Sequence, residues 1–195
     1  MERIAETSRR TEETQIEVRI NLDGVGRSKI NTPVGFFNHM LTLFSRHALF
    51  DLDVKASGDI DVDFHHLVED TGIVLGQAFL KALGEKRGIR RYGSFYVPMD
   101  EALGFSCVDI SGRPFLFFKA EFVQERTGNF DVELVKEFFG AFVNNARITL
   151  HLEVVRGENT HHIIESLFKA FGRSLRDAVS FDERENGIPS TKGVL

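Results

Sequence analysis

A six-residue motif that occurs twice is the feature that most constrains this chain of 195 residues. Residues 65–70 read HHLVED and residues 161–166 read HHIIES, so each copy has two adjacent histidines, two apolar residues and a glutamate. Each copy also follows a predicted helix, a strand and a glycine-containing turn, and it opens a long amphipathic helix. The sequence therefore predicts a single domain, residues 1–195, built by internal duplication, with halves at about 1–92 and 93–185 and a tail at 186–195.

The spacing of apolar residues predicts the elements of both halves. Helices are expected to begin near residues 34, 65, 131 and 161. Strands are expected at 15–23, 49–57, 60–64, 94–99, 102–111, 114–122 and 147–157, whereas 24–33 and the tail should be irregular. No regular alternation of strand, helix and parallel strand appears. The predicted fold class is therefore α+β, two related halves with helices packed on one face of a mixed or antiparallel sheet.

Composition argues against several kinds of partner. The formal net charge is −5, the pI is near 5.8, and the 24 lysines and arginines are scattered, so neither nucleic acid nor a membrane is an expected partner. No apolar run approaches the roughly 18–20 residues that cross a bilayer, and the first residues lack the apolar core of a signal peptide. The single cysteine, Cys107, allows no intrachain disulfide, which fits a cytoplasmic protein.

The geometry of a helix explains what the repeated motif can do. Residues four apart share a helix face, so His65 and Glu69 can bind one ion, while the adjacent His66 points about 100° away. Two adjacent histidines therefore serve two metals better than one. The simplest symmetric assignment joins His65 and Glu69 with His162, and His161 and Glu165 with His66. A lone double histidine is usually just solvated, and it is the repetition that favours metal binding.

Other histidines can complete such sites. His151 on a predicted strand and His39 on a predicted helix are the spare ligands, whereas His47 is better placed to contact substrate. Imidazoles and a carboxylate with open positions suit Mn²⁺ or Fe²⁺ better than a closed structural zinc site, although Zn²⁺ would also bind, and manganese is favoured. Asp70 and the acidic stretch 58–64 are expected to form a solvated edge.

Several ordered motifs give the chain a resemblance to the imidazoleglycerol-phosphate dehydratase family over nearly its whole length. They include TEETQIEVRINLDG, FFNHM, GDIDVDFHHLVED, GIRRYGSF, MDEALGFSCVDISGRP, GENTHHIIESLFKAFGRSLRDA and IPSTKGVL. The resemblance implies a homo-oligomer of 24 subunits and two Mn²⁺ per active site, held at subunit contacts. The metal ligands it implies are His39, His65, His66, Glu69, His151, His161, His162 and Glu165.

The resemblance also implies a reaction, the dehydration of D-erythro-imidazole glycerol 3-phosphate to 3-(imidazol-4-yl)-2-oxopropyl phosphate in L-histidine biosynthesis. No carbonyl acidifies the C–H bond that breaks, so an electron sink is needed, and a substrate imidazolate bound by both metals can supply it. The implied catalytic carboxylates are Glu13, Glu69 and Glu165, with Glu13 as the base. The implied substrate and phosphate contacts are His39, His47, Arg91, Arg113, Ser190, Thr191 and Lys192.

Two other functions remain compatible with the ligands alone. One is a two-metal hydrolase acting on a phosphate ester or amide, and the other is a metal-storage or metal-sensing shell. The phosphate-type residues Arg91, Arg113 and Lys192 argue against storage, and the lack of a bridging-aspartate pattern argues against the hydrolase. The chain departs from the family pattern at Asn38, where an acidic residue is expected and where hydrogen bonding behind His39 would change, and at Ala48, where glycine is expected.

Overall fold

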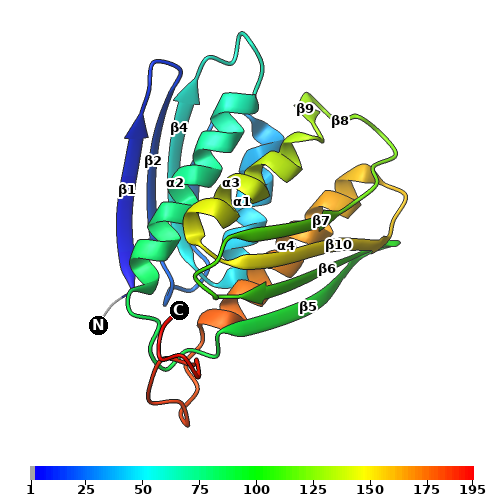
Figure 1. The fold of residues 1–195 in the computed structure, drawn as a ribbon. Helices are drawn as coiled ribbons and strands as arrows, with labels where there is room; N and C mark the ends of the chain where they lie inside the picture. Colours follow the sequence, from blue (N-terminus) through cyan, green and yellow to red (C-terminus); the bar gives the residue numbers. More distant parts are fainter. Residues whose placement is uncertain (1–2) are drawn as a thin grey trace.

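The computed structural model describes residues 3–195, in which two four-stranded sheets enclose four helices (Figure 1). The first sheet has the order β1-β2-β4-β3 and comprises Ile4–Arg10, Thr14–Asn21, Asp51–Gly58 and Ser28–Asn31. The second has the order β5-β6-β10-β7 and comprises Tyr92–Met99, Ala102–Asp109, Thr149–Arg156 and Phe115–Lys119. A two-stranded ribbon, β8 (Arg126–Thr127) and β9 (Phe130–Asp131), lies between β7 and the third helix in sequence.

The helices form two layers between the sheets. They are α1 (Gly35–Ala48), α2 (His65–Leu83), α3 (Leu134–Ala146) and α4 (Thr160–Val179). In the first half, α1 and α2 pack on their own sheet, and in the second half α3 and α4 do the same. The two layers then meet through α2 against α3 and α1 against α4 (Figure 1). Among residues 3–195, no helix is both long and apolar enough to span a bilayer.

The two halves repeat the same topology. In each half, two antiparallel strands are followed along the chain by a third strand, a helix, a fourth strand and a long helix. The third strand pairs parallel to the fourth, and the fourth pairs antiparallel to the second. The order β1-β2-β4-β3 therefore corresponds position by position to β5-β6-β10-β7. The predicted α+β class, with two related halves and the helices on one face of each mixed sheet, is confirmed.

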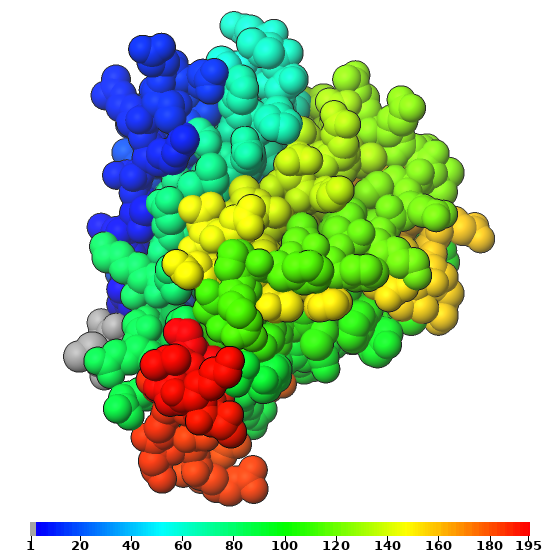
Figure 2. Space-filling view, in the orientation of Figure 1, coloured from blue at the N-terminus to red at the C-terminus, as the bar shows by residue number. Residues whose placement is uncertain are grey.

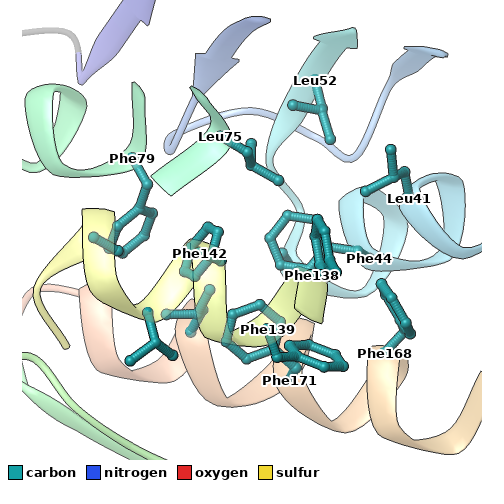
Figure 3. Packing of buried hydrophobic residues seen from close by; sticks show 14 of the residues in the cluster. Leu41, Phe44, Leu52, Leu75, Phe79, Phe138, Phe139, Phe142, Phe168 and Phe171 are labelled. Carbon is teal, nitrogen blue, oxygen red and sulfur yellow. The ribbon is translucent and has the colours of Figure 1, made fainter. Parts of the chain in front are cut away.

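Phenylalanine fills the space between the two helical layers (Figure 3). Phe139 contacts Phe138, Phe168 and Phe171, with ring centroids 4.8–5.4 Å apart, and Phe142 packs edge-on to Phe171 at 5.2 Å. Offset and edge-on pairs of this kind add to the free energy already gained by burying the rings. This aromatic layer fixes the spacing between the two repeated halves, and hence between the starts of α2 and α4.

Several sequence predictions fail for identifiable reasons. Residues 60–64 form turns instead of a strand, since alternation of apolar and acidic residues there is not matched by any partner strand. The stretch 24–33 was predicted to be a loop, yet Ser28–Asn31 forms β3, a short edge strand with only Ile30 partly buried. Strand β1 was not predicted either, because its sequence, IAETSRR, is mostly polar. Asp70 is buried, not solvated, and binds Arg9 and the Thr14 hydroxyl.

Candidate functional site

The two double histidines lie at the beginnings of α2 and α4. At α2, the Asp63 carboxylate accepts a hydrogen bond from the His65 backbone N–H at 2.7 Å. At α4, Asn159 is the N-cap, and its side-chain oxygen accepts from the His162 backbone N–H at 3.2 Å. Both bonds satisfy free N–H groups of a first helical turn. They stabilise the starts of the two helices, where the histidines lie.

One group of candidate ligands combines both halves of the chain. The Oε2 atom of Glu165 lies 3.2 Å from Nε2 of His161 and 3.4 Å from Nε2 of His39. His39 comes from α1 and the other two from α4, and one donor atom of each lies within 4.8 Å of the others. Two imidazoles and a carboxylate that converge in this way fit a divalent transition-metal ion.

Glu165 itself is nearly buried and is paired with Lys169 through its other oxygen. Burial raises the pKa of Glu165, but the hydrogen bond and charge of Lys169, together with the His161 and His39 rings, outweigh it, so the pKa is lowered. The carboxylate is therefore ionised at neutral pH, which is the form that binds a metal.

The second group gathers at the start of α2. His66 Nδ1 lies 3.0 Å from the Asp59 carboxylate and 3.8 Å from that of Glu13, while His65 Nε2 lies 3.7 Å from Glu69. The hydrogen bond with Asp59 raises the pKa of His66, against a smaller effect of desolvation. Glu13, Asp59 and His66 each offer one donor atom within 4.8 Å of the others. Here too, imidazole and carboxylate groups converge.

At the start of α4, His162 faces a different acidic residue. Its Nδ1 lies 2.8 Å from the Glu101 carboxylate, and this hydrogen bond raises the pKa of His162. The same bond, with the N–H of Asn159, lowers the pKa of Glu101 to about 2. A hollow of about 380 Å³ opens beside His162 and is lined by Glu101, Gln124, Glu158, Asn159, Thr160 and His162.

The symmetric assignment of ligands is not realised within one chain. His161 and Glu165 meet His39 in place of His66, and His162 meets Glu101 in place of His65 and Glu69. The helical spacing correctly predicted which residues of one helix share a face. It could not indicate which neighbour each face meets, because that depends on how the two helical layers pack.

His151 and His47 lie apart from both groups. The neighbours of His151 in β10, Leu150 and Leu152, are buried, so the His151 side chain leaves the sheet on the face opposite the helices. There its ring lies 5.3 Å from that of Phe117 and 6.0 Å from that of Phe115. His47 lies half-buried in the last turn of α1, and burial together with nearby Lys169 and Arg173 lowers its pKa.

The predicted phosphate contacts do come together. A cavity of about 220 Å³ is lined by Arg91, Arg113, Ser190, Thr191, Lys192, Val194 and Leu195. Figure 2 shows the C-terminal segment, in red, lying against the rest of the molecule at this end. The Arg91 guanidinium is held by Asp109 at 2.8 Å and donates to the Pro189 carbonyl at 2.9 Å, which ties the tail to the second sheet. Three cationic side chains and two hydroxyls around one cavity suit an anion such as phosphate.

A wider hollow of about 550 Å³ lies on the outer face of the first sheet. Its exposed side chains carry both charges and pair among themselves, as in Arg19 with Glu6 and Lys55 with Glu17. Neither histidine group borders it, so it is no part of the candidate site.

Asn38 does not act behind His39. Its side-chain oxygen accepts from the Thr32 N–H at 3.1 Å and its amide donates to the Thr32 carbonyl at 2.9 Å. A carboxylate could make only the first of these bonds. The departure from the family pattern therefore fixes the turn that leads into α1 without contacting the His39 ring.

Sequence reasoning missed two carboxylates of the site, Asp59 and Glu101. Asp59 was assigned to a solvated acidic edge. Glu101 directly precedes β6 as Glu13 directly precedes β2, and these strands are equivalent in the duplication. This equivalence with Glu13 is the sequence signal that indicates Glu101.

Comparison with known proteins agrees with this geometry. The family model for imidazoleglycerol-phosphate dehydratase matches residues 32–175. The chain is 60% identical over 195 residues to an imidazoleglycerol-phosphate dehydratase of Acetivibrio thermocellus, covering 100% of both chains, and 59% identical over 194 residues to one of Methylobacterium radiotolerans, covering 99% of this chain and all of that one.

Solved structures give the same answer. A crystal structure of imidazoleglycerol-phosphate dehydratase from Staphylococcus aureus has a TM-score of 0.84 at 48% identity, covering 92% of this chain and 99% of that one. One from Pyrococcus furiosus, in complex with (S)-C348, has a TM-score of 0.84 at 38% identity, covering 96% of this chain and 99% of that one. The chain belongs to the imidazoleglycerol-phosphate dehydratase family, a family of hydro-lyases.

Proposed function

We propose that this chain dehydrates D-erythro-imidazole glycerol 3-phosphate to 3-(imidazol-4-yl)-2-oxopropyl phosphate as a step of L-histidine biosynthesis in the cytoplasm. Membership of the family supports the dehydration of imidazoleglycerol phosphate. The observation that carries the proposal for this chain is the convergence of His39, His161 and Glu165 at the start of one repeated helix. The same start in the other half carries His65, His66 and Glu69. Family membership favours this lyase over the hydrolase and the storage shell.

The proposed cofactor is a pair of Mn²⁺ ions in each active site. The residues that would hold them are His39, His65, His66, Glu69, His151, His161, His162 and Glu165. When bound, the two ions would anchor the substrate imidazolate and act as Lewis acids. Imidazole and carboxylate donors with room for substrate suit such open sites better than a closed tetrahedral one.

The site would be completed by another subunit. His151 points away from the helices of its own chain, so it can join the other ligands only through a neighbouring copy. The face that carries it also exposes aromatic rings, since Tyr96, Phe115 and Phe117 are 61%, 56% and 41% exposed. An aromatic face of this kind is typical of an interface. We infer a homo-oligomer in which this face is covered, and 24 is the number of subunits that the family resemblance implies.

Glu13 is the proposed base. It lies in the turn between β1 and β2, with its carboxylate 3.8 Å from His66 and 56% exposed, so a substrate held near His66 is within its reach. The turn itself is fixed, because the backbone N–H groups of Glu13 and Thr14 both donate to the Thr11 hydroxyl. Glu13 would take the C2 proton of the substrate, while Glu69 and Glu165 would act as ligands of the metal ions.

The cationic cavity at the tail would bind the substrate phosphate. Arg91 is held by Asp109 at 2.8 Å, whereas Arg113 is 68% exposed and lies 3.9 Å from the same carboxylate, so its side chain would have more room to adjust to the phosphate. Ser190, Thr191 and Lys192 would bring donors from the tail, and His47 would contact substrate from α1. Within residues 3–195, none of the proposed metal ligands lines this cavity, so we infer that substrate would bridge the cavity of one subunit and the metal ligands of another.

The test is turnover of imidazole glycerol phosphate by metal-stripped protein, with and without added Mn²⁺. Product that appears only with Mn²⁺ is expected. A folded, Mn²⁺-loaded protein that forms no product would refute the proposal, and phosphate release in the same assay would point to the hydrolase.

A further inference from the structure

Glu101 makes contact with both the ring of His162 and the start of the helix that carries it. Its Oε2 atom lies 2.8 Å from His162 Nδ1. Its Oε1 atom accepts hydrogen bonds from the backbone N–H of Asn159 at 2.8 Å and of Glu158 at 3.2 Å. Because Glu101 lies in the turn that joins β5 to β6, these bonds tie the ring, the helix start and the second sheet into one unit.

The hydrogen bond dictates which ring nitrogen is free. An ionised carboxylate only accepts hydrogen bonds, so Nδ1 of His162 must carry the proton. In the neutral ring the lone pair is then on Nε2, the nitrogen that faces away from Glu101 and lies 4.0 Å from the exposed carboxylate of Asp100. In metalloproteins a carboxylate that holds the far nitrogen of a ligating histidine fixes both tautomer and ring orientation.

The first half contains the same arrangement built from a different element. Asp59, which follows β4, lies 3.0 Å from Nδ1 of His66. Glu101, by contrast, precedes β6. The duplication alone therefore does not account for the two contacts, since the carboxylates occupy non-equivalent positions. What the halves share is that a carboxylate hydrogen-bonds Nδ1 of the second histidine of each motif.

We propose that Glu101 is a positioning residue that holds the His162 ring by Nδ1 and presents Nε2 to a metal ion, and that Asp59 does the same for His66. This inference rests on the proposed function, because it concerns ligands of the same metals. Neither carboxylate has to touch the ion or the substrate. Each acts through the histidine that it orients.

A purely structural role for Glu101 is the competing explanation. Its two bonds to backbone N–H groups could simply stabilise the start of α4, and weaker metal binding would then follow from a loosened helix. Asn159 offers a way to separate the two, since its side chain caps the same turn by a hydrogen bond to the His162 backbone N–H and not to the His162 ring.

The experiment is a titration of the metal-free full-length protein with Mn²⁺, following the free ion by electron paramagnetic resonance. Glu101→Gln keeps the size of the side chain but replaces one oxygen by an NH₂ donor, so it cannot accept from the ring and from both backbone groups. The expected result is Mn²⁺ affinity about 10- to 100-fold weaker than that of the wild type, with Asp59→Asn behaving alike. Glu158→Gln, which removes a neighbouring charge, and Asn159→Ala should retain wild-type affinity.

The possible outcomes are distinct. Wild-type protein that binds no Mn²⁺ would overturn the proposed function itself. Wild-type binding with unchanged affinity in Glu101→Gln would overturn the positioning role alone. Asn159→Ala binding as weakly as Glu101→Gln would also overturn it, because helix capping would then explain the loss. A loss confined to Glu101→Gln and Asp59→Asn, with the melting temperature of the metal-free protein unchanged, would support it.

Discussion

At the scale of single residues, the position of Glu13 depends on a short network of hydroxyls. The Thr11 hydroxyl accepts from the N–H groups of Glu13 and Thr14, and the Thr14 hydroxyl donates to the buried carboxylate of Asp70. Asp70 follows Glu69 directly in α2. The turn that carries the proposed base is thus anchored to the helix that carries proposed metal ligands, which keeps the two in register.

Glu13→Gln tests the proposed base. The amide cannot take a proton, so kcat should fall about 100- to 10,000-fold. Mn²⁺ affinity should change little, since Glu13 is proposed to act on substrate. Steady-state kinetics and a Mn²⁺ titration measure the two quantities. Glu12→Gln, in the same turn and exposed, is the matched control and should keep wild-type kcat. Equal kcat for both variants would exclude Glu13 as the base.

Asp51 provides a pH-dependent prediction away from the site. Its carboxylate accepts from the N–H groups of Val25 at 2.9 Å and Arg27 at 3.0 Å. Burial raises the pKa of Asp51, but these bonds and the Arg27 charge outweigh it and lower the pKa. The ionised form therefore contributes stability that is fully present above the unfolded pKa of about 3.9 and is lost as pH falls through the lower folded pKa.

Asp51→Asn should consequently lower the free energy of unfolding at neutral pH by on the order of 1–2 kcal/mol. The difference from wild type should narrow as pH falls below about 4. Urea unfolding of both proteins at several pH values measures it. A difference that stays constant down to low pH would show that the charge of Asp51 does not contribute.

At the scale of elements, the close packing of α2 on α3 depends on two glycines. A Cβ atom at Gly76 would lie 2.5 Å from the Phe142 carbonyl oxygen, and one at Gly72 would lie 2.7 Å from that of Phe138. Alanine normally stabilises a helix relative to glycine. Here it would push α3, and with it the phenylalanine layer, away from α2.

Gly76→Ala should therefore destabilise the protein by about 1–3 kcal/mol, despite the better helix propensity. Gly140→Ala, in α3, is the matched control, because a Cβ there would meet only Leu116 at 4.0 Å. That variant should gain up to about 1 kcal/mol. Chemical denaturation of the three proteins decides between these signs, and a stabilising Gly76→Ala would contradict the described packing.

The sequence predicted most elements because their apolar spacing matches the burial they adopt. Strand β2 alternates between buried Ile16, Val18 and Ile20 and exposed polar residues, as period two requires. The apolar spacing does not predict β1 and β3, because an edge strand needs few apolar residues and forms by hydrogen bonding to its neighbour in the sheet. For the same reason, the sequence identified the helix faces that carry ligands but could not assign His39 to Glu165.

At the scale of the whole molecule, the single chain brings together only part of the proposed site. His151 lies on the outer face of the second sheet, among exposed aromatic rings, whereas the other ligands lie at the starts of α2 and α4 and on α1. The cavity proposed to bind phosphate is formed by the tail together with Arg91 and Arg113. No property of one chain's sequence indicates which copy supplies each group, because that depends on the assembly.

Metal removal should therefore weaken the assembly. If ligands of one ion come from different subunits, the free energy of metal binding contributes to subunit association. Sedimentation velocity should show smaller particles after chelation and recovery of the original size when Mn²⁺ is restored. An unchanged sedimentation coefficient in the stripped protein would indicate that metal binding and association are independent.

Complementation between two inactive variants tests the shared site most directly. Glu13→Gln should lack the base and His151→Ala should lack a ligand, so each alone should be inactive. Mixed without metal and reassembled with Mn²⁺, the two should regain activity, because some sites will combine an intact Glu13 from one subunit with an intact His151 from another. A mixture that assembles with Mn²⁺ yet remains as inactive as its components would contradict a dehydratase site completed between subunits.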